Sequence, residues 1–419
     1  MDRRTLLLSG SAAVAATAAP GIAPLWAQSG TEILIGAVYP LSGSSAQTGV
    51  DAKYVYETVL DIVNNGKDID LPLAKSATAG LASMGTKLKL VFADHQGDPQ
   101  KGRAEAERLI TQDKVSAVIG TYFSSVMVTV SQTCERYQVP VIGAEVSSPS
   151  LHRNKLKYFF RASAHDEMFT AAMFDFLDAL RKKGEKIDTL ALFHEDTIFG
   201  TDSATAQIKL AAERGYKIAA DIKYRANSPS LSSEVQQLKT SNADVLMPSS
   251  YTTDAILLIK TMGELGYKPK AILAQAAGFA EKALYDAVGD KLEGVISRGS
   301  FSLDLAAKRP VITKINELYK ARSGKDLNDN TSREFMGLMV LADAIGRAKS
   351  GDSEKIRAAL AATDIPGDAT IMPWKRVKFG EDGQNVDCDP VLLQYLGGKF
   401  VTVFPEQAAI AAAKWPMNG

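Results

Sequence analysis

The chain is poor in the residues that build metal and redox centres. Its 419 residues include only two cysteines and four histidines. The histidines form no H-E-x-x-H pair and no cluster of zinc spacing with the cysteines, so neither a metal nor another cofactor is predicted. Cys134 and Cys388 lie far apart in the sequence, and an exported chain could bridge them. Because Cys134 falls in a helical pattern as an apolar residue, we expect two separate buried thiols instead.

The sequence also lacks an excess of either charge. Basic and acidic residues number 48 each, so the net charge is zero. A balanced chain gives no sign of a nucleic-acid partner or of an anionic membrane surface. No segment after the N-terminal one is long and apolar enough to cross a bilayer. We therefore expect a small-molecule partner.

The N-terminal segment, residues 1–27, has the layout of an export signal. Arg3 and Arg4 precede an Ala-rich apolar stretch, and small residues lie near Ala27, where cleavage is predicted. The paired arginines favour the twin-arginine route. A membrane anchor is the alternative, but the apolar run is short and broken by proline and glycine, and no cysteine offers a lipid attachment. We predict a soluble protein of the periplasm.

Signatures of phosphate binding and of catalysis are missing as well. The stretch VYPLSGSSAQTGVDA, residues 38–52, joins a strand to a helix through small residues, as a phosphate loop does. However, Val50 and Asp51 follow where that loop needs Lys and Ser or Thr. No G-x-G-x-x-G follows a strand, and the mature chain has no G-x-S-x-G elbow. His194 and Glu195 end a predicted strand and could form a site, but polar strand-end residues are the simpler interpretation, and no enzyme is predicted.

What the chain does have is a regular alternation of apolar strands and amphipathic helices from Ile33 onward. Segments such as ILIGAVY, VSAVIG and VPVIGA are predicted strands, and each is followed by a helical or polar segment. Such repeats predict an α/β fold with parallel sheets covered by helices. Roughly 390 mature residues exceed what one hydrophobic core supports, which predicts two domains.

The last third of the chain changes character. Residues 308–322 and 331–362 are predicted helices. Residues 374–386 and 391–405 are predicted short strands, with turns at Asp382-Gly383 and Gly397-Gly398. Residues 67–86 have no clear periodicity and are predicted to form a surface loop.

The predicted strand ends share a composition rich in Ser, Thr, Tyr and carboxylates and poor in Lys and Arg. They are SGSSAQTG, DHQGDP, GTYFSS, AEVSSPS, HEDTIFG, SSYTTD and QAAGF. In a doubly wound sheet, ligands bind beyond the carboxyl ends of the strands. This lining suits a small polar molecule, uncharged or zwitterionic, and does not suit a phosphate.

These same stretches resemble the leucine/isoleucine/valine-binding protein family, the type I substrate-binding proteins of ABC importers. The resemblance rests on IGAVYPLSGSSAQTG, KLKLVFADHQGDPQKG, VSAVIGTYFSSV, VPVIGAEVSSPSL and YFFRASAHD, in that order behind an export signal. It implies two Rossmann-like lobes with parallel sheets, joined by a three-strand hinge. The implied division is 28–164 for the first part of lobe 1, 165–300 for the first part of lobe 2, 301–370 for the second part of lobe 1, and 371–419 for a hinge strand, strands of lobe 2 and the C-terminal tail.

The resemblance also implies ligand contacts in the first lobe. Family members hold the ligand's carboxylate with a Ser that matches Ser124, and Ser125 lies beside it. The position of Ser124 at a predicted helix start supports an anion there, although the residue could serve only as an N-cap. The next strand end offers Glu145 and Ser147. Where the family has a small residue, Glu145 could take an amine or amide, or could point to solvent.

Further contacts are implied around the cleft. Asp166 matches an acidic position just past the first lobe crossing, and Tyr251 matches an aromatic that closes over the ligand from the second lobe. Gln275 falls near the place of the family's amine-binding Glu, and its neutral amide puts an α-amino acid ligand in question. In the opening stretch, Gln47 and Thr48 are predicted nearest the ligand, or the stretch is only a turn. Tyr122 adds an aromatic wall.

Taken together, these observations predict a monomeric periplasmic solute-binding protein that needs no cofactor and delivers a small molecule to ABC permease subunits in the inner membrane. Amino acids are the first ligand class that we expect, and amides or small aromatic carboxylates are the second. A ligand-sensing receptor of a regulatory system is an alternative with the same fold. An exported hydrolase would need a nucleophile and base at one strand end, and the sequence shows none.

Overall fold

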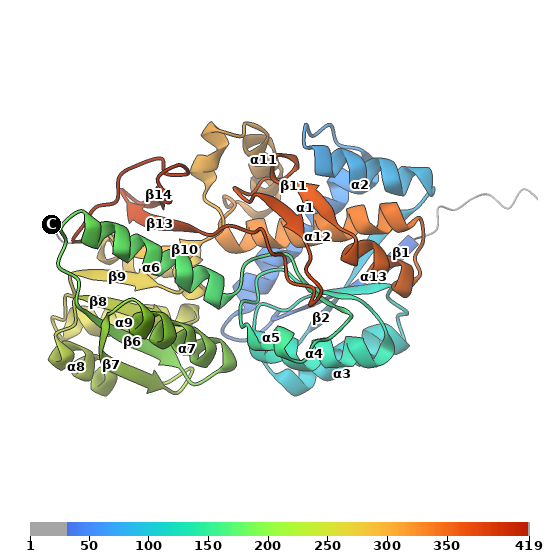
Figure 1. Ribbon diagram of the computed structural model, residues 1–419. Coiled ribbons are helices and arrows are strands. Elements are labelled where there is room, and N and C mark those ends of the chain that lie inside the picture. Colours follow the sequence, from blue (N-terminus) through green and yellow to red (C-terminus); the bar gives the residue numbers. More distant parts are fainter. Residues whose placement is uncertain (1–31, 418–419) are drawn as a thin grey trace, which may run out of the picture.

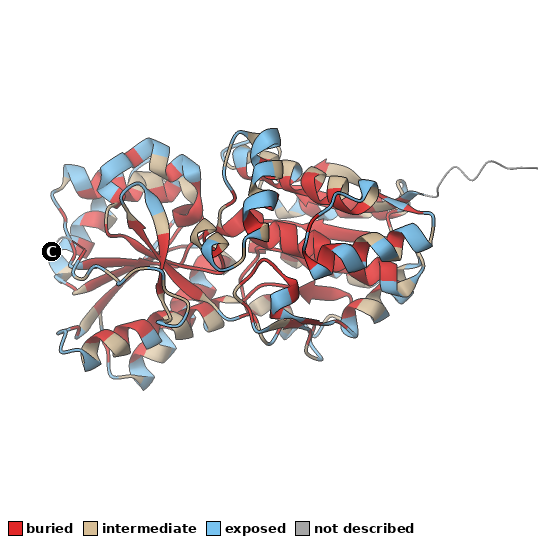
Figure 2. Ribbon diagram, turned by 90° about the horizontal axis from the view of Figure 1, so that it is seen from above, coloured by how far each residue is buried: buried red, intermediate tan, exposed pale blue. Residues whose placement is uncertain are grey.

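The computed structural model describes residues 32–417, so the predicted signal peptide lies outside the described residues. Figure 1 shows two α/β halves side by side, each built on its own sheet. We call the half with the five-stranded sheet lobe 1 and the half with the seven-stranded sheet lobe 2. Figure 2 shows both sheets buried between helices whose outer faces are exposed. The predicted α/β fold with two lobes is confirmed.

The sheet of lobe 1 is parallel throughout. From edge to edge its strands are β2 (Lys87–Asp94), β1 (Glu32–Tyr39), β3 (Ala117–Gly120), β4 (Val141–Gly143) and β5 (Phe159–Arg161). Strands β3 to β5 are buried at every position, because a parallel sheet is covered on both faces. This burial explains why the sequence shows continuous apolar runs instead of alternation.

The helices of lobe 1 come from two parts of the chain. The first part contributes α1 (Ala46–Asn65), α2 (Pro72–Ser83), α3 (Pro99–Thr111), α4 (Ser124–Tyr137) and α5 (Ser150–Arg153). The second part contributes α11 (Val311–Ser323), α12 (Asp329–Ala348) and α13 (Ser353–Ala361), with the short η4 (Gly367–Ala369) and the two-stranded sheet of β11 (Asp364–Pro366) and β12 (Arg376–Lys378).

Lobe 2 has a mixed sheet. In spatial order its strands are β14 (Lys399–Phe404), β13 (Val391–Leu396), β10 (Ile296–Gly299), β9 (Ala271–Ala274), β8 (Val245–Ser249), β6 (Thr189–Glu195) and β7 (Lys217–Tyr224). Only β13 and β14 run antiparallel to their neighbours. Its helices are α6 (Asp166–Lys182), α7 (Ile198–Glu213), α8 (Ser232–Ser241), α9 (Thr252–Glu264) and α10 (Lys282–Val288), with η1 (Gly278–Ala280), η2 (Gly289–Leu292) and η3 (Leu303–Ala307).

The predicted surface loop at 67–86 is wrong, because most of it is helix α2. Leu73, Ala77 and Leu81 recur at helical spacing and are buried against α12. A Cβ at Gly80 would lie 2.7 Å from the Cα of Gly346, so the two helices touch through their backbones. Small residues that look irregular in the sequence are what this close packing requires.

The C-terminal third departs from the prediction in two further places. The helix predicted over 331–362 is two helices, α12 and α13, separated by a turn that begins at Lys349 with φ 47°. Strand β12 pairs with β11 rather than with the residues after its own turn, which form only an isolated bridge. The turn at Gly397-Gly398 joins β13 to β14 as predicted. Cys134 and Cys388 are both free and buried, as expected.

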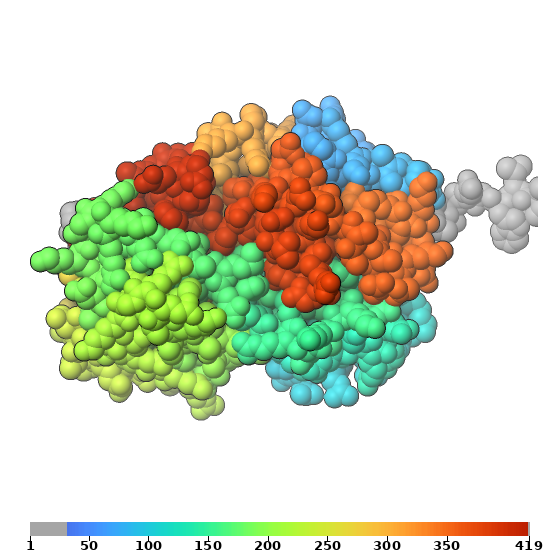
Figure 3. Space-filling model, viewed as in Figure 1, coloured from blue at the N-terminus to red at the C-terminus, as the bar shows by residue number. Residues whose placement is uncertain are grey.

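The chain crosses between the lobes three times, after β5, after β10 and before β13. The first and third crossings contact each other through buried polar groups. Arg161 donates from Nε to Gln384 Oε1 at 2.7 Å, and Asn385 Nδ2 donates to the Ala162 carbonyl at 2.9 Å. Figure 3 shows the segment after α13 covering the junction of the two halves. None of the helices in residues 32–417 is long and apolar enough to cross a membrane.

Candidate functional site between the lobes

The loop after β1 forms one wall of a pocket of about 160 Å³ between the lobes. Asp94, at the end of β2, fixes this loop by accepting from Leu41 N at 2.9 Å and from Ser42 Oγ at 2.6 Å. The pocket is lined by Pro40, Ser42, Ser44, Ser45, Gln96, Gly97, Phe123, Ser125, Glu195, Thr197, Ala226, Asn227, Tyr251, Thr253 and Asp254. The opening stretch of the sequence therefore faces lobe 2 across a pocket.

The two residues predicted nearest the ligand in that stretch lie one turn further on, in α1. Gln47 is exposed and donates from Nε2 to Asp51 Oδ1 at 2.9 Å. Thr48 is buried in the first turn of α1. The serines before them line the pocket, as expected of the small hydroxyl residues in this stretch.

An aromatic cluster closes the space between the lobes. Tyr251 of lobe 2 lies 5.1 Å from Tyr122 and 4.6 Å from Phe123 of lobe 1, measured between ring centroids. Phe199 of α7 lies 5.1 Å from the other side of Tyr251. The two lobes are thus in direct contact through the aromatic residues that the sequence predicted.

Ser124 is the first residue of α4 rather than its cap. The N-cap is Phe123, whose side chain makes no cap bond, so the alternative reading of Ser124 as an N-cap is wrong. Ser124 Oγ accepts from the backbone N–H of Ser148 at 3.4 Å and is buried. Ser125 is half-buried and lines the pocket. The uncapped first turn of α4 carries the partial positive charge of a helix N-terminus.

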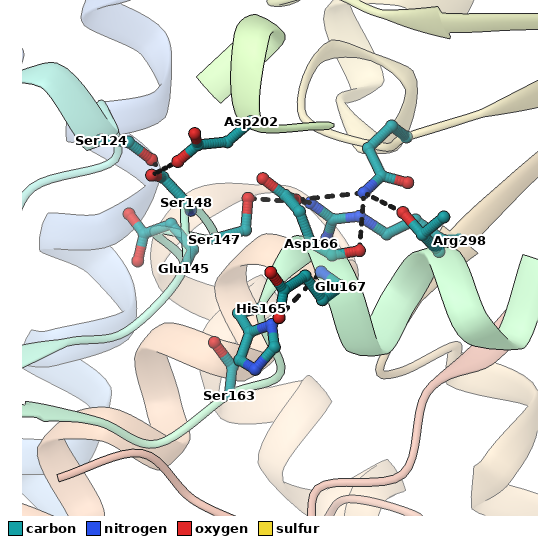
Figure 4. Close-up of polar contacts among 12 residues, drawn as sticks. Ser124, Glu145, Ser147, Ser148, Ser163, His165, Asp166, Glu167, Asp202 and Arg298 are labelled. Atoms are coloured by element: carbon teal, nitrogen blue, oxygen red, sulfur yellow. Dashed lines mark hydrogen bonds and ion pairs between the residues drawn. The ribbon is translucent and has the colours of Figure 1, made fainter. Parts of the chain in front are cut away.

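A buried network joins lobe 1 to lobe 2 behind the aromatic cluster. Arg298, on β10, donates from Nη2 to Ser147 Oγ at 3.3 Å and lies 3.7 Å from Asp166 Oδ1. Gln275 Nε2 donates to the same Asp166 oxygen at 3.2 Å. Burial lowers the pKa of Arg298 to about 10 and raises that of Asp166. Figure 4 shows Ser147, Asp166 and Arg298 pointing toward one another.

The network brings together three predicted residues and one that sequence reasoning missed. Ser147, Asp166 and Gln275 converge from separate strand ends, as the resemblance implied. Arg298 was missed because a guanidinium at the end of the short strand EGVISR carries no motif. Its burial at the end of an apolar strand is the signal that could have found it.

Glu145 points inward, so the predicted alternative of a solvent-facing side chain is wrong. It is only 5% exposed, and its Oε2 accepts from the Tyr39 hydroxyl at 3.2 Å. The carboxyl of Glu334, from α12, influences the pKa of Glu145 and is influenced by it in turn. Burial raises the pKa of both carboxyls, and for Glu334 the charge of Glu145 adds to this effect.

Two more acidic groups were missed by the sequence reasoning. Glu281 of lobe 2 is 5% exposed and accepts from Asn330 Nδ2 at 2.5 Å, and burial raises its pKa to about 7. Asp202 of α7 accepts from Ser148 Oγ and from the backbone N–H of Ser150, the latter at 3.2 Å. Asp202 thereby ties lobe 2 to lobe 1 at the edge of the site (Figure 4).

Comparison with known proteins places the chain among binding proteins. A family model described as periplasmic binding protein matches residues 32–395. The Leu/Ile/Val-binding protein homolog 8 of Brucella suis biovar 1 is 30% identical over 421 residues, covering 98% of each chain. This coverage spans both lobes.

Two solved structures show the same fold. The leucine binding protein LivK of Thermotoga maritima gives a TM-score of 0.74 at 22% identity, covering 88% of this chain and 97% of that one. A solute binding protein of an ABC transporter from Rhodopseudomonas palustris BisB5, in complex with 3,4-dihydroxy benzoic acid, gives a TM-score of 0.73 at 16% identity, covering 93% and 99%.

Proposed function

The chain belongs to the periplasmic binding protein family, and we propose that it is the exported solute receptor of an ABC importer. In this role it captures one small polar molecule between its lobes, as a monomer, and delivers it to permease subunits in the inner membrane. The observation that carries the proposal is the convergence of polar strand ends from both lobes on one buried region. A ligand that contacts both lobes stabilises the closed form by its differential affinity for that form.

Amino acids are the leading ligand class. The uncapped start of α4 at Ser124 suits a carboxylate, and Glu145 or Asp166 suits an amine. The Thermotoga relative is named as a leucine binding protein, which agrees with this class. Ser147 and Gln275 supply neutral hydrogen-bonding groups on opposite lobes. These groups are our proposed ligand contacts, together with Thr48, Tyr122, Ser125 and Tyr251.

Amides and small aromatic carboxylates form the second class. An aromatic ligand could pack against the rings of the cluster formed by Tyr122, Phe123, Phe199 and Tyr251. The Rhodopseudomonas protein was solved with 3,4-dihydroxy benzoic acid, a ligand of that kind. A ligand-sensing receptor for a regulator would use the same pocket, and loss of solute uptake in a strain lacking this protein separates the importer from the sensor.

A thermal-shift screen tests the proposal. The panel contains amino acids, amides and aromatic acids, each added to the purified mature protein. A true ligand at a hundred times its Kd adds about 2.7 kcal/mol to the stability of the folded state. The matched variants are Ser124→Ala in the proposed site and Ser83→Ala at the exposed end of α2. We expect a hit whose shift shrinks in the first variant only, and a shift that is equal in both variants contradicts the placement of the site.

A further inference from the structure

Three cations between the lobes already have acidic partners. Each of the three is ion-paired with an aspartate. The pairs are Arg333–Asp329 at 2.9 Å, Arg298–Asp166 at 3.7 Å and Lys325–Asp51 at 2.8 Å. Both partners of the first two pairs are fully buried, and Asp51 is almost so. The charges of Arg333 and Lys325 also favour the ionised forms of Glu145 and Glu281, but within residues 32–417 neither cation forms an ion pair with those glutamates.

Three glutamates in the same region form no ion pair within residues 32–417. They are Glu145 and Glu334 from lobe 1 and Glu281 from lobe 2, and none is more than 5% exposed. Glu145 receives one hydrogen bond, from Tyr39, and Glu281 one from Asn330. In the described chain neither carboxyl oxygen of Glu334 has a hydrogen-bond donor.

Three buried carboxylates cannot stay ionised together without a positive charge beside them. Removing an unpaired carboxylate from water is costly, so such a group either holds a proton or meets a cation. We propose that the ligand carries a net positive charge on protonated nitrogen, which this receptor binds among Glu145, Glu334 and Glu281. The inference deepens the proposed function and rests on it.

The position of the three glutamates suits a ligand held by both lobes. Glu145 and Glu334 come from lobe 1 and Glu281 from lobe 2, so one cation that touches all three bridges the lobes. A pocket of about 520 Å³ is lined by Asp51, Asp329, Lys325 and Ala280, the residue before Glu281, although none of the three glutamates lines it. The pocket of about 160 Å³ that Ser42 lines is a separate one and shares no lining residue with this pocket.

A second observation, independent of the carboxyls, points to a ligand here. Tyr122 is 4% exposed, and its hydroxyl has no hydrogen-bond partner of standard geometry in the described part of the chain. Burial raises the pKa of Tyr122, the charges of Glu281 and Glu145 add to that effect, and the side chain of Thr252 opposes it. A phenol can accept a hydrogen bond from an N–H donor that also reaches a glutamate.

An organic cation fits the spacing better than a metal ion. No group of three or more His, Cys, Asp or Glu side chains in residues 32–417 is arranged to hold a metal. Amines, guanidines and amidines instead spread several N–H donors over a few ångströms, which matches carboxyls supplied by three separate elements. A zwitterion with no further charge brings a carboxylate as well, which would have to bind outside the cluster, at the first turn of α4.

Proton release gives the test a readout beyond affinity. When a cation enters, the proton held by the Glu145–Glu334 pair leaves to the buffer, because the pair is then compensated by the ligand's charge. The groups that face this pair from the packed elements are Tyr39 of β1, Asp51 and Tyr56 of α1, Arg333 of α12, and Glu281 and Lys325. Burial raises the pKa of both tyrosines, which leaves the glutamates as the proton source.

The experiment is calorimetric titration of the mature protein with 1,4-diaminobutane, agmatine, lysine, leucine and 3,4-dihydroxybenzoic acid. Each titration is run in phosphate and in Tris, whose ionisation enthalpies differ. We expect at least one of the three cations to bind, with an enthalpy that depends on the buffer. Glu334→Gln should weaken that cation tenfold or more and abolish part of the buffer dependence. Glu354→Gln, on the outer helix α13, is the matched control and should change neither.

Two results overturn the inference. If leucine or 3,4-dihydroxybenzoic acid binds and none of the cations does, the solute receptor stands and the cationic ligand is wrong. If a cation binds Glu334→Gln as tightly as the unaltered protein, its nitrogen lies elsewhere. Circular dichroism first verifies that the variant is folded, and Glu145→Gln replaces it if it is not. Failure of every compound in the panel contradicts the cationic ligand too, and the wider thermal-shift screen then decides the proposed function separately.

Discussion

Replacing Glu281 with glutamine should stabilise the ligand-free protein at alkaline pH. Glu281 is 5% exposed, and its Oε1 accepts a hydrogen bond from Asn330 that a glutamine amide oxygen can also accept. The substitution therefore keeps the shape and the bond but removes the charge. A stabilising change inside a binding site is expected where function maintains an unfavourable buried group.

The magnitude follows from the protonation of Glu281. Burial raises its pKa from the usual 4.5 to about 7. Between these two values the folded chain binds more protons than the unfolded chain, so the contribution of Glu281 to stability falls as the pH rises. A difference of about 2.5 pKa units corresponds to roughly 3 kcal/mol, lost in full above about pH 7. Glutamine does not titrate, so the variant does not lose this stability as the pH rises.

Thermal unfolding of both proteins at about pH 5 and about pH 8 measures the effect. The two should differ little at the lower pH, and Glu281→Gln should unfold at a higher temperature at the upper pH. Glu354→Gln is the control. Hydrogen bonds from Arg357 and Tyr158 lower the pKa of Glu354, so this substitution should reduce stability at the upper pH instead of raising it. A Glu281→Gln advantage that is the same at both pH values, or a loss at the upper pH, refutes the reasoning.

Further predictions concern binding, closure and export. If the ligand carries a carboxylate, Ser124→Ala should weaken binding by about 1.5 to 3 kcal/mol, or roughly one to two decades in Kd, and wild-type affinity in calorimetry would move the carboxylate elsewhere. Tyr251→Ala should weaken binding more than Tyr251→Phe, because the ring contacts both lobes; equal losses would assign the effect to the hydroxyl. Asp202→Asn should speed ligand release in stopped-flow measurements, since its charge-assisted bonds hold the lobes together; an unchanged rate argues against the contact. Replacing Arg3 and Arg4 with Lys should abolish periplasmic yield, and normal yield in cell fractions rules out the twin-arginine route.

The architecture was predictable because its signal is repeated along the chain. Buried parallel strands give apolar runs, and the helices between them give amphipathic patterns, so each strand–helix repeat supports the others. Helix α2 was not predicted, because its contact with α12 uses Gly80 and alanines as well as leucines. Close packing of small side chains leaves little periodic signal in a sequence.

Residues of the candidate site were predictable from the sequence only where they lie at the end of a strand. Ser147 and Tyr251 lie at such ends, and the structure places them between the lobes. Glu334 lies in the middle of a helix, where a charged residue usually faces water. It is buried because α12 is enclosed from Asp329 to Gly346 by its neighbours, which depends on contacts with distant segments. The apolar residues all around α12 are the sequence feature that could have indicated this burial.

Small-angle X-ray scattering of the mature protein, with and without the best compound from the screen, measures whether the lobes close on a ligand. A receptor whose lobes close on a ligand becomes more compact when it binds. We expect a smaller radius of gyration at saturating ligand, and Asp202→Asn should reduce the difference between the two radii by favouring the open form. Equal radii with and without a compound that calorimetry shows to be bound would contradict closure of the lobes around the ligand.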